Sequence, residues 1–191
     1  MFHRCGIALT AVLLFAILFR LAVLAYTSPL LDRDSISYLW MAQQWFDHGS
    51  YGAMLQSTDA YYEYTPFLSI FLIQSAMHLG LSAKVAAVIL ALIFGSLIPL
   101  LGYGIAKTVC RSKKVALVSA LFFAINPVLV EYSLQPTREI FYLVWIGLTL
   151  LAACQGIRHR NIGAWAAAGI FCGFACLTRY ESFPNSVKES P

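Results

Sequence analysis

Two carboxylates open the first polar stretch of the chain, Asp32 and Asp34. Such polar groups at a membrane face are the first in the chain that could take part in chemistry. A carboxylate can also cap a helix by accepting free backbone N–H groups. Asp34 is the leading chemical candidate, and its ordinary structural role would be to cap a short helix that ends near Gly49, where glycine suits a left-handed exit. A cation site shared by the two acids is a weaker alternative.

Three further charged residues precede or follow apolar stretches. Glu139 and Arg138 lie just before one apolar segment, and Arg179 lies just after another. An acid in the first turn of a helix is favoured by the helix dipole, so Glu139 also fits an ordinary structural role. Arg138 fits an interfacial anchor or a binder of an anionic headgroup. Arg179 could pair with Glu181 or with a lipid phosphate.

Tyrosines are concentrated around the same polar stretch. Their amphipathic rings are favoured at the level of the lipid headgroups, and the set includes Tyr38, Tyr51, Tyr61, Tyr62 and Tyr64. Apolar residues at helical spacing from Tyr38 to Phe46 predict an amphipathic helix that lies on the membrane. Thr65-Pro66 then begins a short apolar helix, with the threonine as cap and the proline at the first helical position.

The composition indicates where such residues must be held. The chain has 191 residues, of which 60% are hydrophobic and 12% charged, with a mean hydropathy of +0.72. Soluble domains carry about 25% charged residues. The fold class is therefore an all-α polytopic membrane protein. The net charge of +4 comes from short basic clusters, so it indicates membrane topology and predicts no nucleic-acid partner.

Six apolar segments divide the chain. They are Gly6–Tyr26, Phe67–Leu79, Val85–Ile105, Val115–Val130, Ile140–Ile157 and Ile162–Leu177. A helix needs about 20 residues to cross a bilayer, so Phe67–Leu79 is too short. Val115–Val130 is marginal, and Asn126-Pro127 is expected to extend it. The first segment could be a signal peptide, but its length suits a span, and Arg20 within it is expected to snorkel outward.

Basic clusters then select the topology. They are His3-Arg4, Lys107 to Lys114, and Arg158 to Arg160. All three fall on the cytoplasmic side only if Phe67–Leu79 does not cross. We therefore predict five transmembrane helices, with amphipathic juxtamembrane helices in a long first outer loop, Ser28–Lys84. The outer loops that carry Asp34, Glu139 and Arg179 should then meet at one membrane face.

The site shows no signature of a soluble cofactor. Nucleotide-binding loops, zinc-protease motifs, serine-hydrolase elbows and paired CxxC motifs are missing from the sequence. Five cysteines lie in or beside apolar segments and are interpreted as packing residues. Cys172 and Cys176 share a helical face, but no histidine or acid completes a metal set there. No metal ligands are assigned.

Several short motifs occur in a distinctive order. They are Asp34-Ser35-Ile36-Ser37-Tyr38-Leu39 with Met41-Ala42 and Gly49, Tyr64-Thr65-Pro66-Phe67-Leu68, His78-Leu79-Gly80-Leu81-Ser82, Ala124-Ile125-Asn126-Pro127 with Thr137-Arg138-Glu139, and the small-residue segment from Gly169 to Leu177-Thr178-Arg179. This order resembles the GT-C superfamily of polytopic glycosyltransferases that use polyprenyl-phosphate sugars. The likeness is to the branch of protein mannosyltransferases, lipid A aminoarabinose transferases and RgtA-like domains.

The resemblance covers about residues 7–183 and has departures. Thr65 stands where a first proline is common, and Ser35 stands where glutamate often follows the acid. Family members have many more spans. We therefore expect residues 1–183 to be the N-terminal part of the transmembrane module. We interpret residues 184–191 as a polar tail left by truncation or frameshift, which lowers the expectation that the chain completes the reaction alone.

The resemblance implies a mechanism and its partners. A polyprenyl-phosphate-linked sugar would be the donor, and a lipid, glycan or protein would be the acceptor. Asp34 would be the general base, and Glu139 would orient the acceptor, the donor or a divalent metal in the subset that uses one. Arg138 or Arg179 would stabilise the phosphate, and Tyr38, Tyr62 and Tyr64 would bind substrate. The basic clusters predict that the active face lies outside, and the compact loops favour a bacterial inner membrane as the location.

Two other function classes stay open at this point. A small transporter would place charged residues inside the bundle at mid-membrane, whereas the acids here lie at the ends of the apolar segments. A non-catalytic membrane protein is supported by the short chain. The position of the acids favours an interfacial transferase over both.

Overall fold

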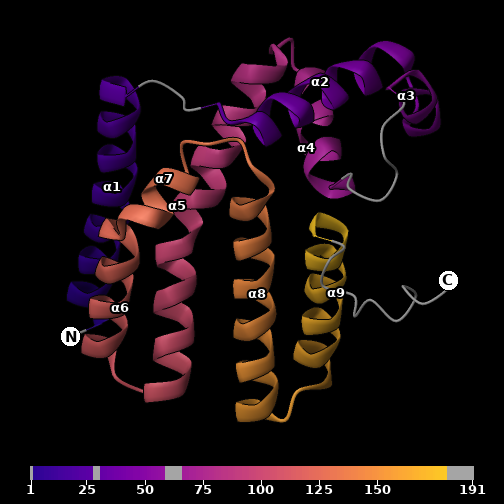
Figure 1. The fold of residues 1–191 in the computed structure, drawn as a ribbon. Helices are drawn as coiled ribbons and strands as arrows, with labels where there is room; N and C mark the ends of the chain where they lie inside the picture. Colours follow the sequence, from indigo (N-terminus) through magenta and orange to yellow (C-terminus); the bar gives the residue numbers. More distant parts are fainter. Residues whose placement is uncertain (1, 28–30, 59–65, 180–191) are drawn as a thin grey trace, which may run out of the picture.

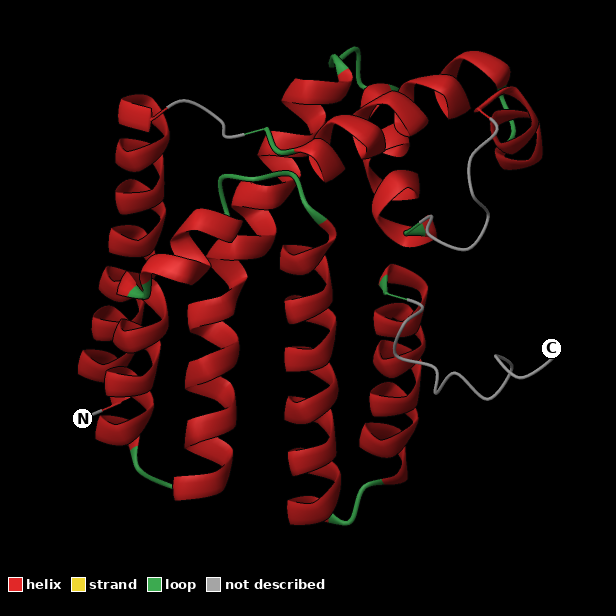
Figure 2. Cartoon of the chain, viewed as in Figure 1, coloured by secondary structure: helices red, strands yellow, loops and turns green. Residues whose placement is uncertain are grey.

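The computed structural model describes residues 2–27, 31–58 and 66–179, and every regular element in these ranges is a helix (Figure 2). The elements in chain order are α1 (Phe2–Thr27), α2 (Arg33–His48), α3 (Tyr51–Thr58), α4 (Phe67–Met77), α5 (Ala83–Cys110), α6 (Lys113–Ile125), α7 (Pro127–Tyr132), α8 (Arg138–His159) and α9 (Ile162–Thr178). The all-α prediction is confirmed. The predicted tail, residues 184–191, lies outside the described residues.

The helices form two parts. Figure 1 shows α1, α5, α6, α8 and α9 side by side as a bundle, with α2, α3 and α4 gathered over one end of it. Three bundle helices are long and apolar enough to cross a membrane, namely Gly6–Thr27 of α1, Ala83–Cys110 and Arg138–His159. The chain is therefore an integral membrane protein, and the exact number of five spans stays a prediction, because α9 and α6 are shorter.

The basic loops lie together, as the charge pattern predicted. The α5–α6 and α8–α9 connections are both at the end of the bundle opposite α2–α4 (Figure 1). Arg158 Nη1 donates a hydrogen bond of 3.0 Å to the Thr108 carbonyl, which ties the end of α8 to the end of α5. The short helix α4 lies at the other end and does not run along the bundle (Figure 1). It therefore does not change the end from which α5 enters the bundle.

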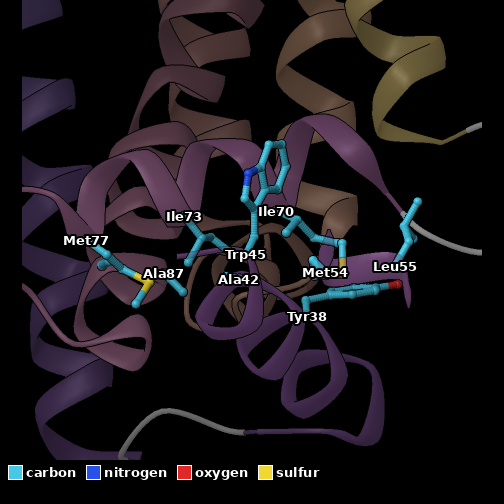
Figure 3. Packing of buried hydrophobic residues seen from close by; sticks show 10 residues of the cluster. Tyr38, Ala42, Trp45, Met54, Leu55, Ile70, Ile73, Met77 and Ala87 are labelled. Atoms are coloured by element: carbon cyan, nitrogen blue, oxygen red, sulfur yellow. The ribbon is translucent and has the colours of Figure 1, made fainter. Parts of the chain in front are cut away.

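The apolar face of α2 packs against protein instead of lying on lipid. Tyr38, Ala42 and Trp45 are buried in a core with residues of α3, α4 and α5, and Figure 3 shows Trp45 of α2 beside Ile70 and Ile73 of α4. The prediction of a helix whose apolar side rests on the membrane is therefore wrong in this detail. Sequence periodicity defines an apolar face, but it does not say what covers that face.

The segment predicted as one marginal span is broken. Asn126 has φ −61° and ψ 119°, and its side-chain oxygen accepts hydrogen bonds from Val128 N and Leu129 N at the start of α7. Proline disfavours helical backbone in the residue before it and lacks an N–H to continue the ladder. Asn126-Pro127 therefore ends α6 and begins α7, so the expected extension of the span does not occur.

Two local predictions need correction. Arg20 does not snorkel: it is fully buried between α1 and the α6–α7 break, because hydropathy shows where a residue lies along a span and not which way it faces. Pro66 is the N-cap residue of α4 and not its first helical residue. Its predicted partner, Thr65, lies outside the described residues.

Close packing fixes α8 beside α5 and α9. Phe94 of α5 meets Phe141 of α8 edge to face, with ring centroids 4.9 Å apart. A Cβ on Gly147 would lie only 2.8 Å from Leu101 of α5, so glycine allows this close approach. Trp145 contacts Phe171 and Phe174 of α9. These contacts set which face of α8 its first turn presents.

Candidate active site

The first turn of α2 separates the two acids by role. Asp32 is the N-cap, and its Oδ1 accepts hydrogen bonds from Ser35 N at 2.8 Å and from Ser35 Oγ at 2.5 Å. Asp34 lies inside the first helical turn and is exposed. The prediction that Asp34 caps the helix is therefore wrong, since a cap lies outside the helix and the start of a helix is uncertain by a residue or two in sequence. Its carboxylate is not taken up by capping. The predicted end at Gly49, with φ 73°, is confirmed.

Tyr38 is a buried residue of α2. It lies one helical turn after Asp34, and its residue is only 5% exposed. Burial raises the pKa of its hydroxyl above the ordinary value; the guanidinium of Arg138 opposes this, and the carboxylates of Asp34, Glu139 and Asp32 raise the pKa further. Charges from both helices therefore act on one phenol. The first turns of α2 and α8 lie at the same end of the bundle, as the topology predicted (Figure 1).

Arg138 and Glu139 form the first turn of α8. Arg138 Nε lies 3.6 Å from Glu139 Oε1, and the side chains are 13% and 27% exposed. Because the pair is partly buried, salt screens its electrostatic attraction less than it would on an open surface. Thr137 precedes them as N-cap residue without a side-chain capping bond. Its hydroxyl is buried and has no hydrogen-bond partner among the described residues, a feature that the sequence gave no reason to single out.

Arg179 reaches the same face of α8 from α9. Its guanidinium carbon lies 5.8 Å from the ring centroid of Tyr142. Tyr142 is four residues after Arg138, so the two share one face of α8. The sequence analysis did not identify Tyr142, although that spacing was a usable signal. Figure 1 shows the end of α9 beside α8 at the end of the bundle that α2 covers.

Two of the predicted substrate-binding residues, Tyr62 and Tyr64, lie outside the described residues. Within the described ranges, no group of three or more histidine, cysteine or acidic side chains could hold a metal ion. Tyr51 packs against Trp45 and Phe67, and its predicted place at the headgroup level stays a prediction. Among the described residues, Asp34, Tyr38, the Arg138–Glu139 pair and Arg179 are the predicted site residues that lie at this end of the bundle, and their roles stay a prediction.

Such a site suits transfer of a group from a phosphate at a membrane surface. An exposed carboxylate can accept a proton, and guanidinium groups can bind phosphate oxygens with two donors at once. A protein-family model, that of the dolichyl-phosphate-mannose-protein mannosyltransferases, matches residues 64–186, well over half of the chain. The chain belongs to this mannosyltransferase family.

The family match confirms the GT-C resemblance and makes the chain a membrane glycosyltransferase of that type. No curated protein and no solved structure matches the chain. The part matched to the mannosyltransferases contains Arg138, Glu139 and Arg179, whereas Asp34 and Tyr38 precede it. The assignment of α2 to the site therefore rests on its position in the structure.

The buried hydroxyl of Tyr38 predicts how the stability of this mannosyltransferase-family protein changes at alkaline pH. Its raised pKa means that the unfolded chain loses this proton at about pH 10 while the folded chain retains it. The free energy of unfolding contributed by Tyr38 is present below that pH and falls as the pH rises through it. Unfolding in detergent from pH 8 to 11 should show a smaller loss of stability at high pH for Tyr38→Phe than for the wild type.

The matched control is Tyr26→Phe, because Tyr26 is 92% exposed. This variant should lose stability at high pH to the same extent as the wild type. An identical alkaline profile for Tyr38→Phe and the wild type would contradict the buried position of the Tyr38 hydroxyl.

Proposed function

We propose that the chain transfers a sugar from a polyprenyl-phosphate donor to an acceptor hydroxyl or amine. Transfer takes place at the end of the bundle that holds the first turns of α2 and α8 and the end of α9 (Figure 1). The observation that supports this most is the placement of the Arg138–Glu139 pair in the first turn of α8, with Arg179 against Tyr142 one turn later on the same helix. The acceptor is a lipid, glycan or protein.

The chemical step follows from these positions. The acceptor oxygen or nitrogen attacks the anomeric carbon, the bond from that carbon to the phosphate oxygen breaks, and polyprenyl phosphate leaves with the bonding electrons. Asp34 accepts the acceptor proton. Arg138 or Arg179 stabilises the charge that develops on the phosphate. Glu139 orients the acceptor or donor, and Tyr38 binds substrate as a neutral phenol that donates a hydrogen bond.

A transfer assay tests this function directly. Purified protein in lipid nanodiscs is supplied with a radiolabelled polyprenyl-phosphate sugar and a mixture of lipid, glycan and peptide acceptors. The expected result is a labelled acceptor together with an equal amount of released polyprenyl phosphate. Donor consumption without labelled acceptor would indicate hydrolysis, and no consumption by folded protein would contradict the proposal.

The orientation is a second part of the proposal. The end with α2–α4 faces the outside, which would be the periplasm of a bacterial inner membrane, and the basic loops face the cytoplasm. This follows from the bias of basic residues toward the cytoplasmic side. Tyr62 and Tyr64 would then line the substrate entrance on the outer face.

Cysteine labelling tests the orientation. In a cysteine-free background, Ser82→Cys at the start of α5 should react with a membrane-impermeant maleimide in intact cells. Ser112→Cys, which lies between α5 and α6, should react only after the cells are opened. The reverse pattern would place the site in the cytoplasm and contradict the proposed orientation.

A further inference from the structure

Arg20 is a fully buried cation inside the first span. Its Nε donates a hydrogen bond of 3.0 Å to Ser133 Oγ, and its Nη1 donates to the carbonyls of Ala16 at 3.1 Å and Ala124 at 3.3 Å. A charged side chain within a membrane span is expensive, and such residues are usually functional. None of these three partners carries a charge. Its Nη2 is buried and has no hydrogen-bond partner among the described residues, so what Arg20 holds in place is held by the three bonds of Nε and Nη1.

One bond satisfies a carbonyl that the helix break releases. In a continuous helix the Ala124 carbonyl would accept from Val128 N, but Val128 N donates to Asn126 Oδ1 instead. Arg20 Nη1 donates to this carbonyl from α1. A carbonyl without a hydrogen-bond partner in an apolar environment is costly, because no water is there to replace the lost bond. Arg20 therefore stabilises the α6–α7 break.

The second bond fixes the end of α7. Ser133 Oγ accepts from Arg20 Nε and donates to the Leu129 carbonyl at 2.5 Å. A Cβ on Gly95 of α5 would overlap the Ser133 side chain, so α5 and α7 also approach closely here. Ser133 is thus held from α1 by a hydrogen bond and from α5 by packing.

This junction leads directly into the site. From Ser133 the chain continues through Leu134, Pro136 and Thr137, all buried, to Arg138 and Glu139 in the first turn of α8. A short buried connector of this kind transmits the position of one end to the other, because close-packed segments have little room to adjust. The place of Arg138 and Glu139 near α2 thus depends on the Arg20 junction.

We propose that Arg20 is a positioning residue, which acts through Ser133 and the segment from Asn126 to Thr137 to hold Arg138 and Glu139 in place in the first turn of α8. The assignment rests on the proposed function for its kinetic consequences. Its geometric content, that the α7–α8 connector is held by α1, is independent of which reaction the site performs.

The kinetic test compares Arg20→Met, Arg20→Lys and Leu18→Ala. Methionine removes the charge and all three hydrogen bonds, and lysine retains the charge but lacks the planar fork that serves separate acceptors. Misplacement of reacting groups by about 1 Å can reduce rates up to about a hundredfold. We expect roughly a ten- to hundredfold lower kcat for both arginine variants. Leu18, two residues away and 63% exposed, should tolerate alanine without loss.

A double variant separates positioning from simple loss of folded protein. If Arg20 acts through Glu139, Arg20→Met should reduce kcat less in a Glu139→Gln background than in the wild type, since neighbours that act as a unit are not additive. A loss of folded protein would lower both backgrounds by the same factor. Equal factors, or unchanged kcat in Arg20→Met, would overturn the proposal.

A distance measurement tests the geometry even if no transfer is found. Spin labels at Ile36→Cys on α2 and Glu131→Cys on α7, both exposed positions, in a cysteine-free background should give one narrow distance distribution. Arg20→Met should broaden or shift it, whereas Leu18→Ala should leave it unchanged. An unchanged distribution in folded Arg20→Met protein would overturn the positioning role, while an inactive wild type would count against the proposed function alone.

Discussion

Replacing Asp34 by asparagine is expected to reduce the rate of sugar transfer by a factor of about 10² to 10⁴, the usual contribution of a positioned general base. Asparagine keeps the size of the side chain but cannot accept the acceptor proton. The loss should appear in kcat, because proton transfer belongs to the chemical step, with a smaller change in the KM for the donor. The measurement is steady-state transfer in nanodiscs with saturating acceptor.

The structure supplies a matched control for this variant. Asp32 is two residues earlier, carries the same charge and caps α2 through Ser35. Asp32→Ala should therefore destabilise the protein by about 1 kcal/mol, as the loss of a helix cap usually does, while turnover per folded molecule stays near the wild-type value. Asp34→Asn should leave the thermal midpoint nearly unchanged, since Asp34 is exposed and not the cap.

Turnover in these two variants therefore shows which acid is the general base. If Asp32→Ala lowers turnover as strongly as expected for Asp34→Asn, Asp32 is the base and the cap is secondary. If neither variant affects turnover, the base lies on another element, such as Glu139 on α8. Full activity in Asp34→Asn would refute the assignment made here.

Charge and hydropathy were sufficient for the frame of the fold. The apolar segments define the bundle helices, and the basic loops at Lys107 to Lys114 and Arg158 to Arg160 indicate which connections share an end (Figure 1). These features can be read along the sequence, because crossing a bilayer depends on the length and polarity of a segment. They predicted that the loops of Asp34, Glu139 and Arg179 lie at one end of the bundle.

The errors share a cause. Arg20 was expected at the surface and lies buried, and the apolar face of α2 was expected on lipid and packs on α4. Both depend on the angular position of a residue around its helix and on which helix covers it, and these are set by tertiary contacts that the sequence does not display. The dipeptide Asn126-Pro127 is a local signal for the end of a helix. It was interpreted as an extension because the segment before it is only marginally long enough for a span.

For the candidate site, the sequence offered a set of residues but not their arrangement, and the roles of these residues stay a prediction. The spacing of Tyr38 after Asp34 and of Tyr142 after Arg138 is visible in the sequence as one helical turn. The positions of these turns depend on the α2–α4 core and on the junction at Ser133, where Arg20 binds a residue 113 positions later in the chain.

The second large effect is expected at Arg138. Arg138→Met should lower kcat/KM by a factor of about 10² to 10³, the usual cost of removing a donor that stabilises developing negative charge. Arg138→Lys should recover only part of this, because a lysine presents a point charge where the guanidinium presents two parallel donors. Stability should change little, since partly exposed ion pairs such as Arg138–Glu139 contribute about 1 kcal/mol or less.

Polyprenyl phosphate itself distinguishes Arg138 from Arg179. The residue that binds the leaving phosphate should, when changed to methionine, weaken inhibition by added polyprenyl phosphate in parallel with the loss of kcat/KM. Arg179 stacks on Tyr142, so Arg179→Lys should weaken that contact even if it has no phosphate role, and Tyr142→Leu reports this contact separately. If Arg179→Met relieves product inhibition and Arg138→Met does not, the phosphate lies at the end of α9. Arg138 would then serve to hold Glu139 toward Tyr38, and its methionine variant should affect acceptor KM more than donor KM.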